Sequence, residues 1–502
     1  MEEPTSIQEV MTTSGVQFGT SGARGLVVAM TDWVCFAYTR AFLQVLRERG
    51  ELPDGTGVAI GGDRRPSTPR IMGAVAAAIR SLNCEVIHLG LVPSPVVALY
   101  GLRHSLPTVM ITGSHIPDDR NGMKFTTAQG EITKRDEVAI KAQSLFRDQL
   151  FDSDGNLIEP EGLPTIRTEA REEYLDRYKK VFGPHALAGL RLAVYGHSAV
   201  GRELFVELYR ALGAQVETLG WSESFVPVDT EAIRPEDVQL ARTWAAHGKF
   251  DAILSSDGDS DRPLTSDERG EWLRGDVTGI LTARFLGADS VVTPVSSNGA
   301  LEISKAFLCV RRTKIGSPFV IEEMQNLADA KEGVVVGYEA NGGFLHSSDL
   351  SIPSSTSRQI RGGILRALPT RDAVLVHLAV LLASREQGKP ISELVATLPQ
   401  RFTASGRDQQ FPTQTSLLLL ERLQRATNQR VAEWCGLDAV AARNTLDGVR
   451  ISFSNGDIIH WRPSGNAPEL RCYAEASSTP RAEELVEKGL QIARRIADEQ
   501  EN

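Results

Sequence analysis

The segments Gly57-Val58-Ala59-Ile60-Gly61-Gly62 and Glu85-Val86-Ile87-His88-Leu89 are two short apolar runs bounded by turn-forming or polar residues. The stretch between them, residues 68–82, is rich in alanine and has Pro69 near its start, which predicts a helix. Strand, helix and strand within about thirty residues form a βαβ unit, with parallel strands joined by a right-handed crossover. This part of the chain therefore predicts an α/β fold.

The same order of elements recurs twice. A strand at 192–195, a helix at 201–212 and a strand at 215–220 form a second copy, and residues 290–313 contain a third. Three such units predict three related α/β domains.

The sequence after residue 400 has a different pattern. We predict a polar connection at 401–410, a hairpin at 448–461 that turns at Asn455-Gly456, and a final amphipathic helix at 480–498. Residues 1–15 are expected to form a loose polar tail. The predicted domains span residues 1–155, 156–265, 266–395 and 396–502.

Composition excludes several classes of protein. The chain has 54 basic and 64 acidic residues, a net charge of −10, which argues against a dedicated nucleic-acid binder. No signal peptide and no long apolar run is evident, so we expect a cytoplasmic protein without membrane partners. The five cysteines contain no CxxC pair, which favours reduced core thiols over a zinc site or disulfides. Nothing in the sequence indicates an oligomeric state.

The segment Thr112-Gly113-Ser114-His115-Ile116-Pro117-Asp118-Asp119-Arg120-Asn121-Gly122-Met123-Lys124 follows an apolar strand at 109–111. Its small and turn-forming residues predict a tight loop that carries Ser114, with a further turn at Asn121-Gly122. A nucleophilic serine needs a base and a positive setting, which His115 and Lys124 would supply. The alternative is a polar turn with an incidental Ser-His pair.

Two further segments have features of anion and cation sites. In Phe18-Gly19-Thr20-Ser21-Gly22-Ala23-Arg24-Gly25, glycines and hydroxyls surround one arginine, which suits an anion-binding loop; a simple turn is the alternative. Asp257, Asp259 and Asp261 follow a buried strand at 252–256 and precede Arg262. Closely spaced carboxylates suit a hard cation such as Mg²⁺, although a solvated acidic turn has the same pattern.

Two later segments offer hydrogen-bonding groups for a sugar phosphate. Glu339 and Asn341 lie among glycines after an apolar run and suit vicinal hydroxyls, while Lys314 lies in a basic loop after a strand. A hairpin turn is the alternative for the glycine-rich segment. Near the C-terminus, one loop offers many donors suited to a phosphate: Arg462, Ser464, Gly465, Asn466 and Arg471.

These loops are complementary in their chemistry. A nucleophile, an acidic triad, a hydroxyl-binding loop and a phosphate-binding loop each follow a predicted strand, and open α/β sheets gather such loops at the carboxyl ends of their strands. Phosphoryl transfer needs positioning and charge neutralisation. No GxxxxGK[ST] motif is present, so a nucleotide donor is not expected.

With these motifs in this order, residues 16–495 resemble the α-D-phosphohexomutase superfamily, bacterial phosphomannomutase/phosphoglucomutase type. The resemblance implies three related α/β domains and a smaller C-terminal two-layer α+β domain around a central cleft. It implies a mutase that interconverts hexose 1-phosphate and hexose 6-phosphate, with mannose as the first candidate sugar and glucose as the second. The partners would be small sugar phosphates, and a hexose 1,6-bisphosphate would be the intermediate and activator.

The resemblance also implies roles for individual residues. Ser114 would be the phosphoserine, and its oxygen would join Asp257, Asp259 and Asp261 around Mg²⁺. Arg24 and Arg262 would lie beside the transferring phosphoryl group, Lys124 would transfer a proton and His115 would adjoin the nucleophile. Substrate-binding residues would be Thr20, Ser21, Lys314, Glu339, Asn341, Arg462, Ser464, Gly465, Asn466 and Arg471.

Several positions depart from the family pattern. Ser260 replaces a glycine in the metal loop, Asn341 replaces a serine and Gly343 a common histidine in the sugar loop, Ser317 replaces a histidine, and Asn466 replaces a threonine. The sugar-contacting positions are among those altered, so the preferred sugar stays open. A phosphoglucosamine mutase, a non-catalytic sugar-phosphate binding protein and a phosphatase are the alternatives.

Overall fold

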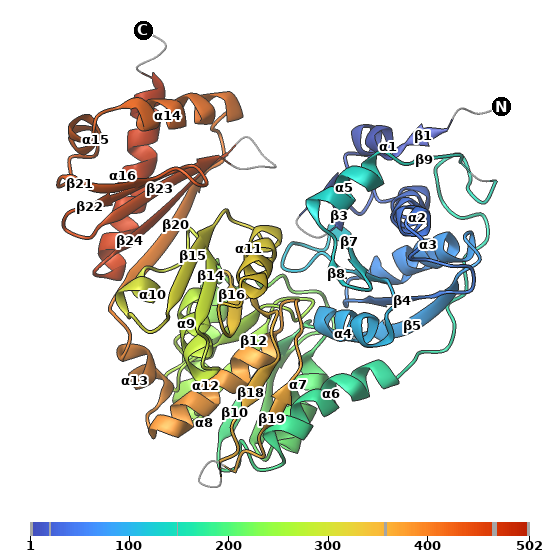
Figure 1. The fold of residues 1–502 in the computed structure, drawn as a ribbon, viewed down its shortest axis with the longest axis horizontal. Helices are drawn as coiled ribbons and strands as arrows, with labels where there is room; N and C mark the ends of the chain where they lie inside the picture. Colours follow the sequence, from blue (N-terminus) through green and yellow to red (C-terminus); the bar gives the residue numbers. More distant parts are fainter. Residues whose placement is uncertain (1–3, 20–21, 148, 356–358, 464–468, 499–502) are drawn as a thin grey trace. The chain divides into compact units, whose positions relative to one another are not determined.

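The computed structural model describes residues 4–19, 22–147, 149–355, 359–463 and 469–498 (Figure 1). The chain divides into two compact units. The first unit contains residues 1–288 and 324–394, and the second contains residues 289–323 and 395–502. In the part of the chain that is described, no helix has the length and apolar character needed to cross a membrane.

The first sheet of the first unit has the strand order β2-β3-β7-β6-β4-β5, with β8 paired to β7. Its strands are β2 (Gln17–Phe18), β3 (Gly22–Leu26), β4 (Gly57–Gly62), β5 (Glu85–Leu91), β6 (Thr108–Ile111), β7 (Arg120–Thr127) and β8 (Gly130–Glu131). Strand β4 is parallel to both β5 and β6, whereas β7 is antiparallel to β3 and β6. The predicted βαβ unit is confirmed, because α3 (Thr68–Arg80) connects β4 to β5.

Helices cover both faces of this sheet. A Cβ added at Gly62 would meet Thr68 and Met72 of α3, whereas one added at Gly61 would meet Val97 of α4 (Ser94–His104). Helix α2 (Asp32–Glu48) packs against α3, and the small side chains of α3 allow a close approach (Figure 1).

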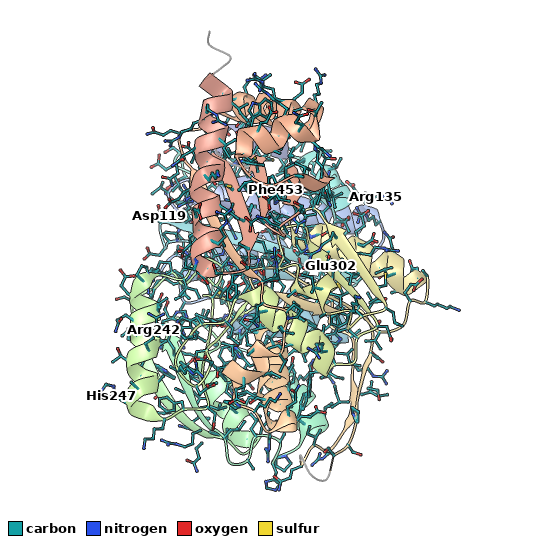
Figure 2. All side chains as sticks on the ribbon, turned by 90° about the vertical axis from the view of Figure 1, so that its left-hand side faces the viewer. Asp119, Arg135, Arg242, His247, Glu302 and Phe453 are labelled. Carbon is teal, nitrogen blue, oxygen red and sulfur yellow. The ribbon has the colours of Figure 1, made fainter. Side chains whose placement is uncertain are left out.

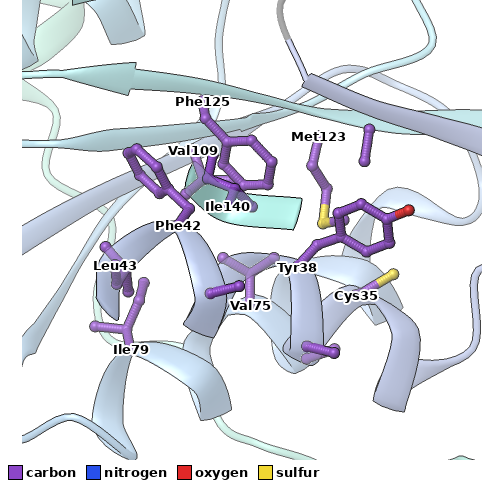
Figure 3. Packing of buried hydrophobic residues seen from close by; sticks show 14 of the residues in the cluster. Cys35, Tyr38, Phe42, Leu43, Val75, Ile79, Val109, Met123, Phe125 and Ile140 are labelled. Carbon is purple, nitrogen blue, oxygen red and sulfur yellow. The ribbon is translucent and has the colours of Figure 1, made fainter. Parts of the chain in front are cut away.

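Figure 3 shows the apolar core beneath this sheet. Phe42 of α2 stacks on Phe125 of β7 with ring centroids 4.9 Å apart, and Val75 and Ile79 of α3 close the same cluster. All four side chains are almost completely buried. Each contributes about 1.5–3 kcal/mol by leaving water, so this core fixes the strand ends on which the functional loops begin.

The predicted polar tail over residues 1–15 is wrong in part. Residues 7–14 form helix α1 (Ile7–Ser14), whose buried Ile7, Val10 and Met11 lie on one face. Ser6 and Glu9 form a capping box at its start, a motif that stabilises short helices. The polar residues that suggested a tail occupy the solvent side of this amphipathic helix. Just before α1, β1 (Thr5–Ser6) pairs with β9 (Ser144–Leu145), and α5 (Lys134–Lys141) precedes β9.

A second sheet of the first unit has the order β11-β10-β12-β13. Its elements are β10 (Arg191–His197), α7 (Arg202–Ala211), β11 (Gln215–Trp221), α8 (Pro235–Gly248), β12 (Ala252–Ser256) and β13 (Pro263–Thr265). Strands β10 and β11 are parallel, which confirms the second βαβ unit. The exposed face of α8 carries Arg242 and His247 (Figure 2).

The remaining elements of the first unit include two hairpins. Strand β16 (Val335–Tyr338) pairs with β17 (Phe344–His346), and β18 (Leu350–Ile352) pairs with β19 (Gly363–Leu365). The helices are α6 (Glu169–Phe182), α9 (Gly275–Phe285) and α12 (Ala373–Gln387); α11 (Ser317–Asp329) and α13 (Ile391–Ala396) cross from one unit to the other along the chain.

In the second unit, β14 (Ser290–Pro294) and β15 (Cys309–Thr313) are parallel and α10 (Ala300–Ile303) lies between them in the chain. A five-stranded antiparallel sheet follows in the order β20-β24-β23-β22-β21. Its strands are β20 (Phe402–Asp408), β21 (Val440–Asn444), β22 (Val449–Phe453), β23 (Ile458–Pro463) and β24 (Leu470–Ala476), covered by α14 (Thr413–Arg425), α15 (Asn428–Cys435) and α16 (Thr479–Asp498).

The hairpin predicted at 448–461 is confirmed by the pairing of β22 with β23. The polar connection predicted at 401–410 is wrong, because residues 402–408 form β20 and pair along their whole length with β24. These residues lack a clear apolar alternation, so the strand is specified by its partner and not by its own sequence. All five cysteines are free thiols, and all but Cys309 are buried, as expected. The boundaries between the four predicted domains stay a prediction.

Buried histidines make the first unit sensitive to acid. His377 of α12 is fully buried, which lowers its pKa to about 3, and its Nδ1 is hydrogen-bonded to Tyr209 Oη at 2.6 Å. Below pH ~6.5 the unfolded chain takes up a proton here while the folded chain does not, so stability falls as pH falls. Between pH ~6.5 and ~5 this one histidine costs about 2 kcal/mol.

We therefore expect His377→Gln, which keeps an acceptor for Tyr209, to reduce the loss of thermal stability between about pH 7.5 and about pH 5. Differential scanning calorimetry of both proteins at both pH values measures this. An equal fall of Tm in variant and wild type would show that His377 is not a source of the acid sensitivity.

Candidate active site

The loop after β6 holds Ser114 in an unusual conformation. Its φ is +57°, in the left-handed region that costs a non-glycine residue about 1 kcal/mol or more. Thr112 Oγ1 accepts a hydrogen bond from Ser114 N at 2.8 Å, and the Ser114 side chain is buried. The expected tight loop is confirmed, and its strain is maintained by surrounding contacts.

The loop is shorter than the sequence suggested. Asn121 and Gly122 form no turn but lie in β7, where Gly122 pairs with Arg24 of β3. A Cβ at Gly122 would lie 2.8 Å from the carbonyl oxygen of Ala23, so glycine is needed here for strand approach and not for turning. Similarly, Arg24 belongs to strand β3 and not to a glycine-rich loop. Thr20 and Ser21, predicted to bind substrate, lie outside the described residues.

Arg65 holds the Ser114 loop in place through hydrogen bonds to its backbone. Its guanidinium donates to the carbonyl oxygens of Ser114 (2.9 Å), Ile116 (2.5 Å), Pro117 (2.6 Å) and Arg120 (2.9 Å). Its Nε donates to Asp63 Oδ2 at 3.1 Å, and neither side chain is exposed to solvent. Asp63 also accepts from Thr112 Oγ1 at 2.7 Å. This network rigidly positions the candidate nucleophile.

We expect Arg65→Met to destabilise the protein by about 3–5 kcal/mol, because it leaves Asp63 as a buried carboxylate without its cation. Turnover should fall as well, since the loop loses four backbone bonds. Arg64→Met is the matched control: Arg64 makes a partly exposed ion pair with Glu203 at 2.7 Å, worth at most about 1 kcal/mol. Thermal unfolding that is equal for the two variants would contradict the proposed fastening.

Asp257, Asp259 and Asp261 lie on the loop between β12 and β13 and are fully buried. One carboxylate oxygen of each lies within 4.8 Å of the others. Ser114 Oγ donates to Asp257 Oδ2 at 2.6 Å, so the candidate nucleophile meets the triad directly. The sequence predicted both groups, and the structure brings them together.

The donor set fits a hard divalent cation. Lys124 Nζ donates to Asp259 Oδ2 at 2.5 Å and to Asp261 Oδ2 at 2.7 Å. Among the described residues, the opposite oxygens, Asp259 Oδ1 and Asp261 Oδ1, are buried without a hydrogen-bond partner. Unpaired buried carboxylate oxygens are costly, and a cation would satisfy both. The triad can therefore bind a metal ion.

The surroundings shift the pKa values of Asp257 and Asp259 in opposite directions. Burial and the neighbouring Asp259 and Asp261 raise the pKa of Asp257 well above its usual value. Burial alone would also raise the pKa of Asp259, but the charge and hydrogen bond of Lys124 and the hydroxyl of Ser94 lower it. Lys124 thus keeps one part of the triad ionised.

Cations surround the triad and Ser114. Burial and the nearby guanidinium of Arg262 lower the pKa of Arg24 to about 10. Burial and Arg262 also lower the pKa of His115 to about 3, so its imidazole is neutral. Arg262 Nη1 donates to His115 Nδ1 at 3.0 Å, whereas Ser114 Oγ is 3.3 Å from the same nitrogen. In this arrangement the hydroxyl of Ser114 donates to Asp257, and the excess positive charge suits a phosphate.

Glu339 and Asn341 lie in the turn between β16 and β17. Glu339 is buried, and its Oε2 lies 3.4 Å from Nη1 of Arg371, a residue that the sequence did not single out. Asn341 Oδ1 accepts from Gly343 N at 2.9 Å, so its oxygen stabilises the turn. The hairpin expected as the alternative and the predicted hydroxyl-binding role are therefore compatible.

The second unit carries the other predicted residues. Arg462 and Arg471 are directly opposite in the β23–β24 register, and like charges in this position are unfavourable without an anion. Arg462 Nε donates to Asp447 Oδ2 at 2.9 Å, and Arg471 Nε donates to Glu469 Oε1 at 3.1 Å. Lys314 is exposed after β15. Ser464, Gly465 and Asn466 lie outside the described residues.

The chain is similar to known proteins over most of its length. Phosphoglucomutase/phosphomannomutase family models match alpha/beta/alpha domain I at residues 15–149, alpha/beta/alpha domain III at 274–402 and the C-terminal domain at 423–491. A phosphomannomutase of Salmonella muenchen is 43% identical over 483 residues, which cover 95% of this chain and 96% of the relative. A phosphomannomutase of Sinorhizobium fredii is 40% identical over 479 residues, covering 95% and 98%.

A solved structure of a phosphoglucomutase/phosphomannomutase family protein from Burkholderia thailandensis has a TM-score of 0.71 at 18% identity and covers 98% of each chain. Fold and matched domains together define an intramolecular phosphotransferase. The chain belongs to the phosphoglucomutase/phosphomannomutase family, the bacterial type of α-D-phosphohexomutase. It is a phosphohexomutase, and the predicted fold class is confirmed.

Proposed function

We propose that the enzyme interconverts mannose 1-phosphate and mannose 6-phosphate through a phosphoserine at Ser114. The corresponding glucose phosphates are the second candidate substrates. The observation that supports this most is the 2.6 Å hydrogen bond from Ser114 Oγ to Asp257 within a buried, cation-rimmed acidic triad. Two relatives at 40% identity or more are phosphomannomutases, which favours mannose over glucosamine.

Asp257, Asp259 and Asp261 would hold Mg²⁺ together with an oxygen of phosphorylated Ser114. The bound cation would neutralise charge on the phosphoryl oxygens and make the serine oxygen a better leaving group. Arg24 and Arg262 bind the equatorial oxygens of the transferring phosphoryl group, since both guanidinium groups are among the cations that surround Ser114 and the triad.

Lys124 is the proton carrier in this proposal. It donates to two triad carboxylates, so a charge change at the triad alters the proton affinity of its Nζ. The amine gives a proton to the sugar oxygen that leaves when a phosphoryl group returns to Ser114, and takes one from the sugar hydroxyl that attacks the phosphoserine. His115, neutral and bonded to Arg262, fixes that arginine beside Ser114.

The substrate is bound by separate groups for hydroxyls and phosphate. Glu339 and the amide nitrogen of Asn341 bind sugar hydroxyls. The family resemblance assigns Lys314, Arg462, Ser464, Gly465, Asn466 and Arg471 to the phosphate that is not transferred, and Thr20 and Ser21 to the substrate.

A hexose 1,6-bisphosphate is the intermediate in this scheme. Phosphoserine gives its phosphoryl group to the sugar monophosphate, the bisphosphate reorients, and the other phosphoryl group returns to Ser114. Each transfer breaks one P–O bond and forms another, so no co-reactant is consumed. Added bisphosphate therefore serves as an activator. A cytoplasmic location and the absence of nucleic-acid and membrane partners stay predictions.

Phosphorus NMR with Mg²⁺ and a trace of hexose 1,6-bisphosphate tests the substrate. Separate samples contain mannose, glucose or glucosamine 1-phosphate. We expect the mannose 6-phosphate signal to grow fastest. Fastest conversion of glucosamine 1-phosphate would establish the alternative mutase, and release of inorganic phosphate would indicate a phosphatase. No change with any sugar, in protein shown by mass spectrometry to carry phosphate on Ser114, would contradict the proposal.

A further inference from the structure

Arg371 lies between Asp261, which the proposed function assigns to metal binding, and Glu339, which it assigns to sugar binding. It immediately precedes α12 and its cap residue Asp372, and its side chain is buried. Its Nε donates to Asp261 Oδ2 at 3.1 Å, and its Nη1 lies 3.4 Å from Glu339 Oε2. One guanidinium therefore contacts both a carboxylate of the metal loop and the carboxylate of the sugar loop.

The segment that carries Arg371 is held on both sides. Asp372 accepts hydrogen bonds from Tyr174 Oη at 2.5 Å and from Tyr178 Oη, and it caps α12 by accepting from Val374 N at 3.1 Å. Thr370 Oγ1 donates to Glu131 Oε1 at 3.1 Å. These bonds fix the backbone on each side of Arg371, so the direction of its side chain is well defined.

Gly343 provides the space for this arginine. A Cβ built at Gly343 would lie 2.4 Å from Cδ and 2.9 Å from Cγ of Arg371. Its φ is outside the left-handed region, so its backbone would tolerate alanine. The absence of a side chain at position 343 thus leaves room for the Arg371 side chain, which comes from the residue before the cap of α12.

The contact with Asp261 also explains which oxygen of this carboxylate remains to bind a cation. Lys124 and Arg371 both bond to Oδ2, while Oδ1 is buried without a hydrogen-bond partner among the described residues and lies 3.8 Å from Arg262 Nε. Two fixed donors on one oxygen set the orientation of the carboxylate and leave its other oxygen for a cation. Groups that orient a metal ligand in this way usually change metal affinity by about 10–100-fold when removed.

We propose that Arg371 is a positioning residue that couples the metal loop to sugar recognition: it orients Asp261 toward the cation and Glu339 toward the sugar hydroxyls. The proposal rests on the proposed function of these two carboxylates. It deepens that function by making metal binding and sugar binding depend on one side chain, and it assigns to Gly343 the task of leaving room for it.

The test uses two substitutions that disturb Arg371 differently. Arg371→Met removes both contacts, and Gly343→Ala keeps the arginine but displaces its Cδ. Calorimetric titration of the substrate-free protein with MgCl₂ measures metal affinity, and steady-state kinetics with mannose 1-phosphate separates KM from kcat. Arg366→Met is the control. Arg366 lies on the same β19–α12 connection as Arg371, and it makes an exposed ion pair with Asp349.

We expect Arg371→Met to weaken Mg²⁺ binding by about 10-fold or more and to raise KM, and Gly343→Ala to do both to a smaller extent. In the double variant, alanine at 343 should add no further loss, because the side chain that it displaces is gone. Arg371→Lys keeps the charge without the planar fork. Its Mg²⁺ affinity should therefore stay closer to the wild-type value than its KM does.

Unchanged Mg²⁺ affinity in the two single variants, with only Tm lowered, would reduce Arg371 to a structural residue and overturn the proposal. Additive effects of Gly343→Ala and Arg371→Met would overturn the role of Gly343. If Arg371→Met does not fold, Gly343→Ala and Arg371→Lys carry the test. The metal titration needs no turnover, so it remains decisive even if the proposed mannose phosphate activity fails.

Discussion

Ser114→Ala is expected to lower hexose phosphate turnover by on the order of 10⁴-fold or more, the scale seen when a covalent nucleophile is removed. The side chain is buried and its Oγ bonds to Asp257 at 2.6 Å, so alanine removes the hydroxyl that meets the triad directly. Mutase assays with mannose 1-phosphate and the bisphosphate activator measure the effect.

The fold should survive this change. Alanine keeps the backbone bond from residue 114 to Thr112 and the bond from Arg65 to the carbonyl of residue 114. Ser81→Ala is the matched control for loss of a serine hydroxyl: Ser81 is the C-cap of α3, its Oγ donates to the carbonyl oxygen of Ala78 at 2.7 Å, and the change should leave turnover unchanged. Near-normal turnover by Ser114→Ala would remove Ser114 from its proposed role.

Removal of divalent metal is expected to stop turnover, with a loss of about 10³-fold or more that added Mg²⁺ restores. The physical reason is the pair of buried oxygens on Asp259 and Asp261 that have no hydrogen-bond partner among the described residues: a cation would satisfy both and would neutralise charge on the phosphoryl oxygens. Dialysis against a chelator followed by titration with Mg²⁺ measures the loss and the recovery.

Asp259→Asn should weaken Mg²⁺ binding and lower turnover by about 10²-fold or more, because an amide neither neutralises the cation nor pairs with Lys124. Asp119→Asn makes the same chemical change at an exposed position on the Ser114 loop, labelled in Figure 2, and should have no effect on either. Full activity in excess chelator would contradict the role of the triad.

Much of the fold could be predicted from local pattern, and the exceptions have physical causes. The βαβ units were predicted because their strands are buried and apolar and their helices are amphipathic or rich in alanine. The glycines at 22 and 122 suggested turns, yet they allow β3 and β7 to approach, which only the partner strand reveals. Strand β20 likewise depends on its pairing with β24.

The candidate site was predictable where chemistry follows a strand. Ser114 and the aspartate triad stand directly after apolar runs, and their residue types indicate their chemistry. Arg65 and Arg371 could not be found in this way, because their partners are about 50 to 110 residues away and they carry no local motif. The only local signals were Asp63 beside Arg65 and the helix cap Asp372 beside Arg371.

The departures from the family pattern differ in how far the structure explains them. Ser260 has a φ of +59°, a conformation in which glycine is usual, and its Oγ accepts from Gly201 N at 3.0 Å and contacts Ser256 Oγ at 2.9 Å. Its hydroxyl thus ties the metal loop to the start of α7. Gly343 makes room for Arg371. The replacement at Ser317 has no structural explanation here.

Mass spectrometry of the phosphoenzyme in a single turnover tests the mechanism most directly. Protein treated with mannose 1,6-bisphosphate and Mg²⁺ is freed of ligand, digested and mapped, before and after mixing with mannose 1-phosphate. We predict one phosphoryl group per chain, on Ser114, that moves to the sugar and appears as the bisphosphate. Phosphate on another residue, or phosphate on Ser114 that the sugar does not remove, would contradict the mechanism.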